Sequence, residues 1–219
     1  MTNANSGRDA RQRDIVPPDR LAMCRATVVG VGAVGRQVAL QLAAMGVPHL
    51  QLIDPDTVEE VNLACQGYLE TDLGREKVHA TADLCRQINP QIEIHSEQGR
   101  FRRHGEVGNV LFCAVDDIEV RRLIWQAAGD RVQYFTDGRM SAEVVRVLSA
   151  ADEASRKHYP TTLFTSAEAY QAACTAKSTI FTANIAAGLM LSQFSKWLRH
   201  LPIDKDLTLN LLSAELSLG

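Results

Sequence analysis

A short glycine-rich turn opens the stretch of this sequence that could do chemistry. Gly30, Gly32 and Gly35 have the spacing of a loop whose backbone approaches a phosphate closely, just ahead of a helix N-terminus with partial positive charge. Asp54 follows Gly35 by 19 residues (54 − 35), the interval at which a carboxylate can hold ribose hydroxyls. These features indicate a nucleotide and fit NAD and ATP equally well.

The polar residues downstream favour ATP. Lys77 falls early in an expected helix, where its ammonium could reach phosphate oxygens and offset charge that develops in a transition state. Asp116 follows an expected strand and could hold Mg²⁺ between phosphate oxygens. The other candidates for nucleotide binding are Asp56, Asn62, Gln66 and Asp117. Taken singly, Asp54 and Asp116 also fit strand-end caps and Lys77 fits a solvated lysine, whereas together they favour a site.

The elements around these residues alternate between strand and helix. Apolar patterns predict strands near residues 27–29, 50–53, 92–94, 110–113 and 132–135, and helices over 34–45, 78–88, 118–128 and 178–198. A valine-rich segment at 140–148 is expected to add an antiparallel strand. The alternation predicts an α/β, doubly wound, Rossmann-like and mostly parallel sheet, which binds ligands at the carboxyl ends of its strands. Asp54 and Asp116 both fall at such strand ends.

The sequence predicts one domain preceded by an arm. Residues 1–22 contain the pair Pro17 and Pro18 and read as a mobile N-terminal arm. Residues 23–219 form the domain, and the segment 151–175 is expected to be a crossover or flap over the site. The 219 residues suffice to bury a substantial core.

Composition argues against several classes of function. The chain has 23 Lys and Arg against 26 Asp and Glu, a formal charge of −3 and no long basic run, so no nucleic-acid partner is expected. Its five cysteines form no Cys-x-x-Cys pair, which argues against a disulfide framework or a four-cysteine zinc site and fits a reducing cytoplasm. The most apolar stretch, 180–198, is interrupted by polar residues and predicts a buried helix, with no membrane association.

Several motifs in order along the chain resemble the ThiF/MoeB/HesA superfamily of adenylating enzymes, which are related to eukaryotic ubiquitin-activating enzymes. The matching parts are the arm at 8–12, the Asp54/Asp56 pair, the segments 62–66 and 72–77, and the Cys113-x-x-Asp116 strand end with the following Arg121. The resemblance implies ATP- and Mg²⁺-dependent adenylation of the C-terminal glycine carboxylate of a ubiquitin-like or sulfur-carrier protein. It also implies that Arg11 reaches the site of a neighbouring subunit in a homodimer. Compact relatives occur beside conjugating-enzyme-like proteins, which adds such a protein as a candidate partner.

The resemblance marks Cys174 for a second step, thioester formation or sulfur transfer. Cys174 precedes the helix expected at 178–198, whose N-terminus would favour the nucleophilic thiolate. A small buried residue that packs under the crossover is the equal alternative.

The chain also departs from the superfamily pattern. Cys65 stands where the superfamily has an arginine that contacts phosphate, and a thiol lacks both its charge and its fork of donors. Arg36 and Arg75 are candidates to compensate for that loss. The cysteine pairs that bind zinc in the superfamily are absent, so no zinc is expected.

Other functions stay open at this point. A catalytically silent subunit that binds a nucleotide or a carrier is one, with Cys65 as its argument. An NAD-dependent oxidoreductase is another, supported only by the glycine loop and Asp54. Adenylation of a small molecule or a tRNA nucleoside is a further reading within the superfamily.

Overall fold

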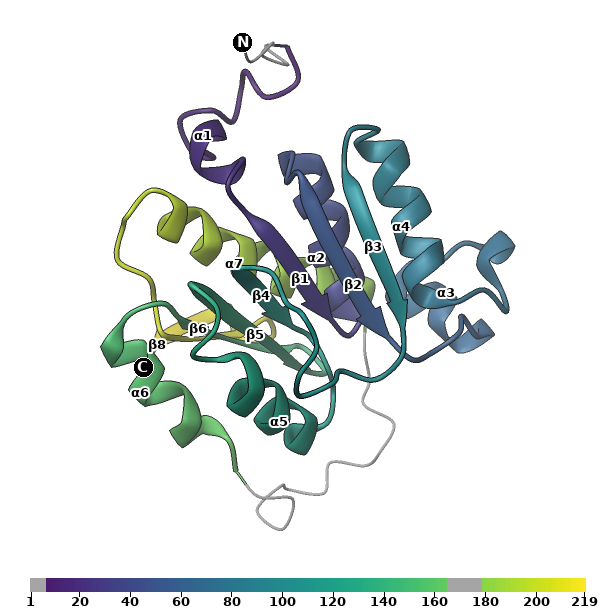
Figure 1. Cartoon of the computed structure of the whole chain (residues 1–219). Coiled ribbons are helices and arrows are strands. Elements are labelled where there is room, and N and C mark those ends of the chain that lie inside the picture. Colours follow the sequence, from purple (N-terminus) through teal and green to yellow (C-terminus); the bar gives the residue numbers. More distant parts are fainter. Residues whose placement is uncertain (1–6, 165–178) are drawn as a thin grey trace.

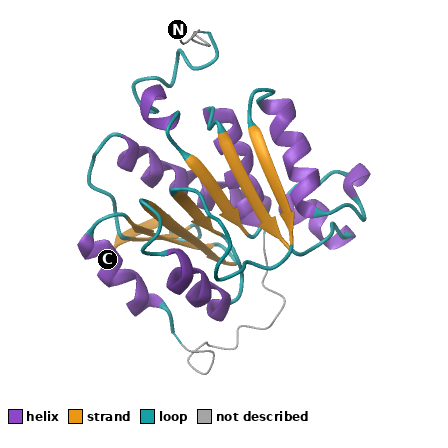
Figure 2. Ribbon diagram, viewed as in Figure 1, coloured by secondary structure: helices purple, strands orange, loops and turns teal. Residues whose placement is uncertain are grey.

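The computed structural model describes residues 7–164 and 179–219 of the chain (Figures 1 and 2). Its strands form one eight-stranded sheet in the order β3-β2-β1-β4-β5-β6-β7-β8. The strands are β1 (Arg25–Val29), β2 (His49–Asp54), β3 (Glu93–Gln98), β4 (Val110–Cys113), β5 (Tyr134–Ser141), β6 (Val144–Ala150), β7 (Asp206–Asn210) and β8 (Glu215–Leu218). The helices are α1 (Pro18–Leu21), α2 (Ala33–Met45), α3 (Glu60–Gln66), α4 (Lys77–Ile88), α5 (Ile118–Ala128), α6 (Glu153–His158) and α7 (Ile180–Leu198), with 3₁₀ turns η1 (Glu70–Asp72) and η2 (Tyr159–Thr162).

The first five strands pair in parallel and the last three extend the sheet antiparallel. The parallel strands form where the sequence has short apolar runs, because a strand covered on both faces must be apolar throughout. β4 is such a strand, with all four of its residues buried. The α/β fold class with an antiparallel extension is therefore confirmed.

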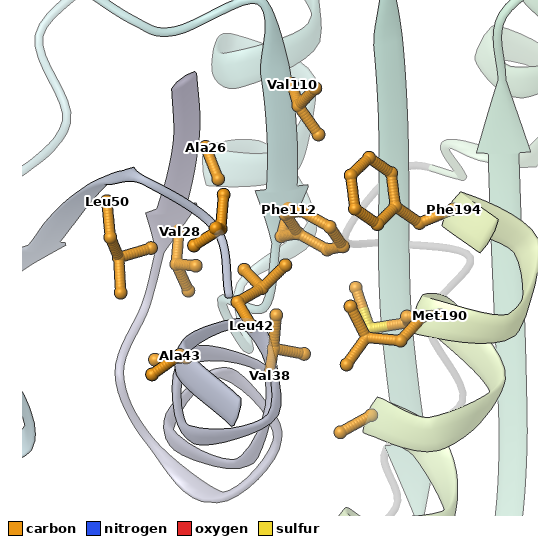
Figure 3. Packing of buried hydrophobic residues seen from close by; sticks show 14 of the residues in the cluster. Ala26, Val28, Val38, Leu42, Ala43, Leu50, Val110, Phe112, Met190 and Phe194 are labelled. Carbon is orange, nitrogen blue, oxygen red and sulfur yellow. The ribbon is translucent and has the colours of Figure 1, made fainter. Parts of the chain in front are cut away.

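Helices cover both faces of the sheet. On one face, residues of α2, α4 and α7 join the inward side chains of β1, β2, β4 and β6 in the main hydrophobic core. Figure 3 shows Leu42 of α2 and Met190 and Phe194 of α7 against Val28 and Phe112 of the sheet. On the other face, α5 and the η2 turn pack on β4, β5 and β6 in a second cluster. These two cores hold the strand ends in fixed positions.

The carboxyl ends of β1, β2 and β4 lie together at one edge of the sheet (Figure 1). From β1 the chain passes through α2 to β2 on one side, whereas β4 pairs with β1 on the other. Between β1 and β4 the strand order therefore changes direction, and an open α/β sheet has its ligand crevice at such a switch point.

Two segments differ from the sequence expectations. The first part of the predicted crossover, up to residue 164, contains α6 and η2, which pack on the second face of the sheet. Residues 165–175 lie outside the described residues, so the flap stays a prediction. The hairpin of β7 and β8, which the sequence analysis did not predict, closes the sheet at its far edge.

The described part of the N-terminal arm, residues 7–22, packs against its own domain. Arg8 donates to the carbonyl of Ile88 at 2.7 Å, and Gln12 donates to the carbonyl of Met45 at 2.8 Å. Ser195 of α7 donates to the carbonyl of Ile15 at 2.7 Å. Residues 7–22, which belong to the arm that the sequence predicts to be mobile, are therefore attached to the domain by these hydrogen bonds. Over the described ranges, no helix is long and apolar enough to cross a membrane.

Candidate nucleotide-binding site

The glycine loop joins β1 to α2 and leaves the N-terminus of α2 open. Gly30 has a φ of +85°, and a Cβ there would lie 2.8 Å from the carbonyl of Ala114. A Cβ on Gly35 would clash with the carbonyl of Gly30, so these two glycines are required for the turn itself. A Cβ on Gly32 would meet only the Gln66 amide, at 3.9 Å or more. Gly32 is the N-cap of α2 without a side-chain cap, so the first N–H groups of α2 are left for an anion.

Asp54 ties the glycine loop to the end of β2. It is 5% exposed, and its two oxygens accept the backbone N–H groups of Val31 at 2.6 Å and Asp56 at 2.9 Å. Burial raises the pKa of Asp54, while these two hydrogen bonds and the charge of Lys77 act in the opposite direction. Each oxygen keeps a second lone pair, so the predicted ribose contact stays a prediction.

Lys77 begins α4 and is not a solvated lysine. Its side chain is 7% exposed, and its Nζ lies 3.0 Å from a carboxylate oxygen of Asp56, whose side chain is 60% exposed. The backbone N–H of Lys77 also donates to the carbonyl of Asp56, at 3.0 Å. A buried lysine side chain with an exposed counterion can exchange that partner for a phosphate oxygen.

Helix α3 carries Asn62 and Gln66 along one border of the site. Asn62 accepts the N–H of Glu59 at 2.9 Å and completes a capping box, so its carboxamide oxygen is used within the chain. The carboxamide oxygen of Gln66 is buried and has no hydrogen-bond partner among the described residues. That oxygen faces Gly32 and is available to a ligand that donates a hydrogen bond or brings water. The thiol of Cys65 donates to the carbonyl of Val61, at 3.2 Å.

Asp116 and Asp117 follow β4 and have different surroundings. Asp117 is the N-cap of α5 and accepts the N–H groups of Glu119 and Val120, at 2.7 and 3.2 Å. Asp116 is exposed and makes no hydrogen bond or ion pair to any described residue. Asp116 is therefore the carboxylate that is free to bind a cation, whereas Asp117 shapes the loop.

The loop that carries Asp116 is fixed from below by Arg121. Its guanidinium is buried and contacts the carbonyls of Val115 and Gly138 and the carboxylate of Asp137. Arg139 and the hydroxyl of Tyr159 also donate to Asp137, at 2.8 and 3.0 Å. Burial lowers the pKa of Arg121, while the charges of neighbouring groups that include Asp116 act in the opposite direction. The hydrogen bonds and the ion pair that fix the loop therefore come from Val115, Gly138 and Asp137, and Asp116 adds only its charge.

Arg36 and Arg75 are the candidates to compensate for Cys65. Neither has a guanidinium that is both exposed and unpaired. Arg75 is paired with Asp72 and Asp83, at 3.0 and 2.5 Å. Arg36 is 2% exposed and stacks on the ring of Tyr68 at 4.5 Å. In this conformation, neither Arg36 nor Arg75 therefore adds a positive charge that could replace the arginine missing at Cys65.

Arg11 and Cys174 lie outside this cluster for different reasons. Arg11 is exposed, and its neighbour Gln12 bonds to Met45 at the C-terminal end of α2. The glycine loop precedes the other end of this 13-residue helix, which is about 20 Å long. Arg11 is therefore remote from the site of its own chain. Cys174 lies outside the described residues.

A hollow lies away from these groups. It has a volume of about 900 Å³ and is lined by residues of β1, β2 and β3 such as Thr27, Gln51 and His95. It includes neither the glycine loop nor Lys77, so the candidate nucleotide site rests on the groups at the strand ends and not on this hollow.

The residues at the strand ends fit a polyphosphate, and Asp116 adds one carboxylate for a cation whose other ligands would be phosphate oxygens and water. Among the described residues, no group of three or more His, Cys, Asp or Glu side chains is placed to hold a metal ion by itself. The open space at Gly32, the unpartnered oxygen of Gln66 and the free carboxylate of Asp116 are features that the packing of the chain does not require. Phosphate binds to helix N–H groups and ammonium groups, and Mg²⁺ binds to carboxylate oxygens. Sequence reasoning missed Tyr68, which lies between these elements. In the sequence, Tyr68 is distinguished only as an aromatic residue in a polar segment. This feature is too weak to identify a functional residue.

Known proteins resemble this chain in sequence. A ubiquitin-like modifier-activating enzyme 5 of Caenorhabditis briggsae is 33% identical over 135 residues, 54% of this chain and 31% of its own length. A SAMP-activating enzyme E1 of Haloferax volcanii is 35% identical over 111 residues, 48% of this chain and 41% of its own. The chain thus spans less than half the length of these curated relatives.

Solved structures agree in fold over nearly the whole chain. The crystal structure of PaaA has a TM-score of 0.82 at 19% identity and covers 100% of this chain and 74% of its own. A structure of E. coli MccB with AMPCPP and MccA has a TM-score of 0.79 at 16% identity, covering 98% and 71%. The sequence profile of the ThiF family matches residues 11–216, and the chain belongs to the ThiF family.

Proposed function

We propose that this protein uses ATP to adenylate the C-terminal glycine carboxylate of a ubiquitin-like or sulfur-carrier protein. The observation that carries the proposal is the buried Lys77 side chain, paired at 3.0 Å with the exposed carboxylate of Asp56, beside an uncapped helix N-terminus and the exposed carboxylate of Asp116. A nicotinamide enzyme has no need of this lysine at the phosphates. The names of the relatives, which include activating enzymes and adenylyltransferases, support the same activity.

The reaction needs positioning and charge stabilisation more than covalent work by side chains. A carboxylate oxygen of the carrier attacks the α-phosphorus, a new P–O bond forms, and the bond from that phosphorus to the bridging oxygen breaks. Pyrophosphate leaves with the electron pair and an acyl-adenylate remains. The N–H groups of the α2 N-terminus and Lys77 would bind phosphate oxygens. Asp116 would hold Mg²⁺, and the cation would supply neutralisation of charge on the phosphates.

The remaining parts of the proposal concern a second chain and a second step. Because Arg11 is remote from the site of its own chain, it contributes to the site of a partner copy in a homodimer. The thiolate of Cys174 would attack the acyl-adenylate, so that a thioester C–S bond forms and AMP leaves with the electron pair of the broken C–O bond. In the sulfur-transfer alternative, Cys174 carries a persulfide supplied by a sulfur donor, its outer sulfur displaces AMP, and a second thiol cleaves the resulting acyl disulfide to release the thiocarboxylate and leave a disulfide. A conjugating-enzyme-like protein in the cytoplasm is the proposed recipient.

ATP–pyrophosphate exchange tests the activity. The purified protein is incubated with Mg·ATP, labelled pyrophosphate and the ubiquitin-like protein encoded nearest to it. Carrier-dependent label in ATP is expected, and a carrier without its terminal glycine is the matched control. ATP binding without exchange for any carrier would favour the second candidate, a silent binding subunit, for which Cys65 is the specific argument. Absence of ATP binding would overturn the proposed activity and would leave only a silent subunit that binds a carrier.

A further inference from the structure

Tyr68 lies where three parts of the proposed site meet. It follows α3, is 4% exposed, and its hydroxyl oxygen lies 2.7 Å from the carbonyl oxygen of Val31 in the glycine loop. The same hydroxyl lies 3.2 Å from the hydroxyl of Thr81 and 3.5 Å from the carbonyl of Lys77, both in α4. One side chain therefore connects the glycine loop with the helix that carries the phosphate-facing lysine.

The hydroxyl has a single proton, and the short distance assigns it to Val31. Burial raises the pKa of Tyr68, so the group stays protonated and donates. The Thr81 hydroxyl can then donate to the tyrosine oxygen. Val31 is held on both sides, because its N–H donates to Asp54 at 2.6 Å. The two bonds fix Val31, the residue that precedes Gly32. Because Gly32 has no Cβ, space is left there in which a phosphate could bind.

The ring of Tyr68 is fixed by an unusual neighbour. The guanidinium of Arg36, in the first turn of α2, stacks on it at 4.5 Å. The Nε and Nη2 atoms of Arg36 are buried with no hydrogen-bond partner among the described residues, so the stack is a main contact of this cation. Gly67 has a φ of +74°, and a Cβ there would lie 3.7 Å from Nη1 of Arg36. Arg36, Gly67 and Tyr68 thus form one packed unit beneath the loop.

We propose that Tyr68 is a positioning residue for ATP, whose hydroxyl sets the spacing between the glycine loop and Lys77. The inference rests on the proposed function, since it assigns Tyr68 to the same nucleotide site. It differs from a packing role because the ring alone would fill the space, whereas the hydroxyl bonds to two segments that face the phosphates.

The variant Tyr68→Phe removes the hydroxyl and keeps the ring on Arg36. The variant removes the hydrogen bond to the carbonyl of Val31. The net free energy of one such bond corresponds to a factor of about 3 to 10 in an equilibrium constant. We expect the Kd for Mg·ATP, measured by calorimetry, to rise by about that factor. The KM for ATP in exchange should rise in parallel while the KM for the carrier stays unchanged.

The control is Tyr134→Phe, at a tyrosine that is fully buried and whose hydroxyl bonds Ser149 and a carbonyl of α7, away from the site. A second variant, Tyr68→Leu, removes the ring as well and should lower Tm further without weakening ATP binding beyond the Phe variant. If Tyr68→Phe lowers Tm as the control does and leaves the Kd for Mg·ATP unchanged, Tyr68 is only a packing residue. The calorimetric readout needs no carrier and no turnover, so it decides the inference even where exchange fails.

Discussion

Lys77 combines a buried side chain with a charged end that is paired to an exposed carboxylate. A charged side chain that is only 7% exposed is costly unless it is paired, and Asp56 supplies the partner from a largely exposed position. When a triphosphate binds, its oxygens can take over part of that role. Such an arrangement keeps a cation in place before the substrate arrives, so little reorganisation is needed during the reaction.

Replacement of Lys77 by methionine tests this role at the residue scale. Methionine keeps most of the apolar stem and removes the charge, so we expect carrier-dependent exchange to fall by about 100-fold or more while the fold is retained. Lys157→Met, at an exposed lysine paired with Glu153, is the control and should keep wild-type exchange. Exchange at the wild-type rate in Lys77→Met would contradict the mechanism.

The residues of the site could be predicted from the sequence better than their individual tasks. Asp54, Asp56 and Lys77 do lie together, because the two aspartates stand at the end of β2 and the bridge between Thr57 and Glu76 brings the start of α4 alongside them. What the sequence could not predict is which polar groups the backbone already uses. Asp54 accepts two N–H groups and Asp117 caps α5, and such bonds depend on loop geometry that no residue spacing specifies.

At the scale of elements, replacement of glycine by alanine is expected to destabilise the protein at the end of α2 and to stabilise it within α7. Gly46 ends α2 with a φ of +96°, a conformation that L-residues rarely adopt. Gly188 lies within α7, and a Cβ there has open space. Gly46→Ala should cost about 1 kcal/mol and lower Tm by about 2–4 °C, whereas Gly188→Ala should stabilise by about 0.5–1 kcal/mol. Thermal unfolding measures the Tm of both variants. A change of Tm in the same direction in both would contradict the explanation from backbone conformation.

The edge of the sheet depends on a carboxylate that should make stability sensitive to acid. Asp206 of β7 accepts two hydrogen bonds from Arg146 of β6, at 2.9 and 2.6 Å, and lies 2.9 Å from Nε2 of His158 in α6. These contacts, first the hydrogen bonds from Arg146, hold the pKa of Asp206 below its usual 3.8. Because the folded pKa is depressed, the stabilisation is present above about pH 4 and is lost as the pH falls further.

Urea unfolding between pH 6 and pH 3 measures that contribution. Asp206→Asn lacks the titrating group, so its midpoint should be lower than that of the wild type at pH 6 and should approach it towards pH 3. Other acids with depressed pKa values, such as Asp83 and Asp152, titrate in both proteins and cancel in the difference. A constant difference across this range would show that the contact with Arg146 does not depend on the charge of Asp206.

The elements that the sequence analysis missed carry little burial pattern. All four residues of β8 are exposed, and in α6 only Ser155 is buried, so neither shows the apolar periodicity that identified α2, α4 and α5. Their positions follow from pairing with β7 and from packing on β6, which are long-range contacts. Local patterns predict elements that bury a face, and tertiary context decides the others.

At the scale of the whole molecule, the two ends of the sheet have separate tasks. The carboxyl end holds the candidate nucleotide site, and the opposite end holds the packed arm with Arg11, as Figure 1 shows for the described segment that leads into α1. With the arm hydrogen-bonded to Met45 and Ile88, Arg11 cannot approach the site of its own chain while those bonds persist. If Arg11 takes part in the reaction, the reacting unit is therefore a pair of chains.

Complementation between two inactive variants tests that arrangement. Arg11→Ala keeps Lys77, and Lys77→Met keeps Arg11, so in a mixed dimer the site of the first chain receives an intact Arg11 from the second. The other site of that dimer lacks both groups. Random assembly of co-expressed chains makes about half of the dimers mixed, with one working site each, so about one quarter of wild-type exchange should return. If Arg11 acts within its own chain, every site lacks one group and the mixture stays inactive. A chain that sediments as a monomer and retains full exchange as Arg11→Ala would exclude a role for a partner subunit altogether.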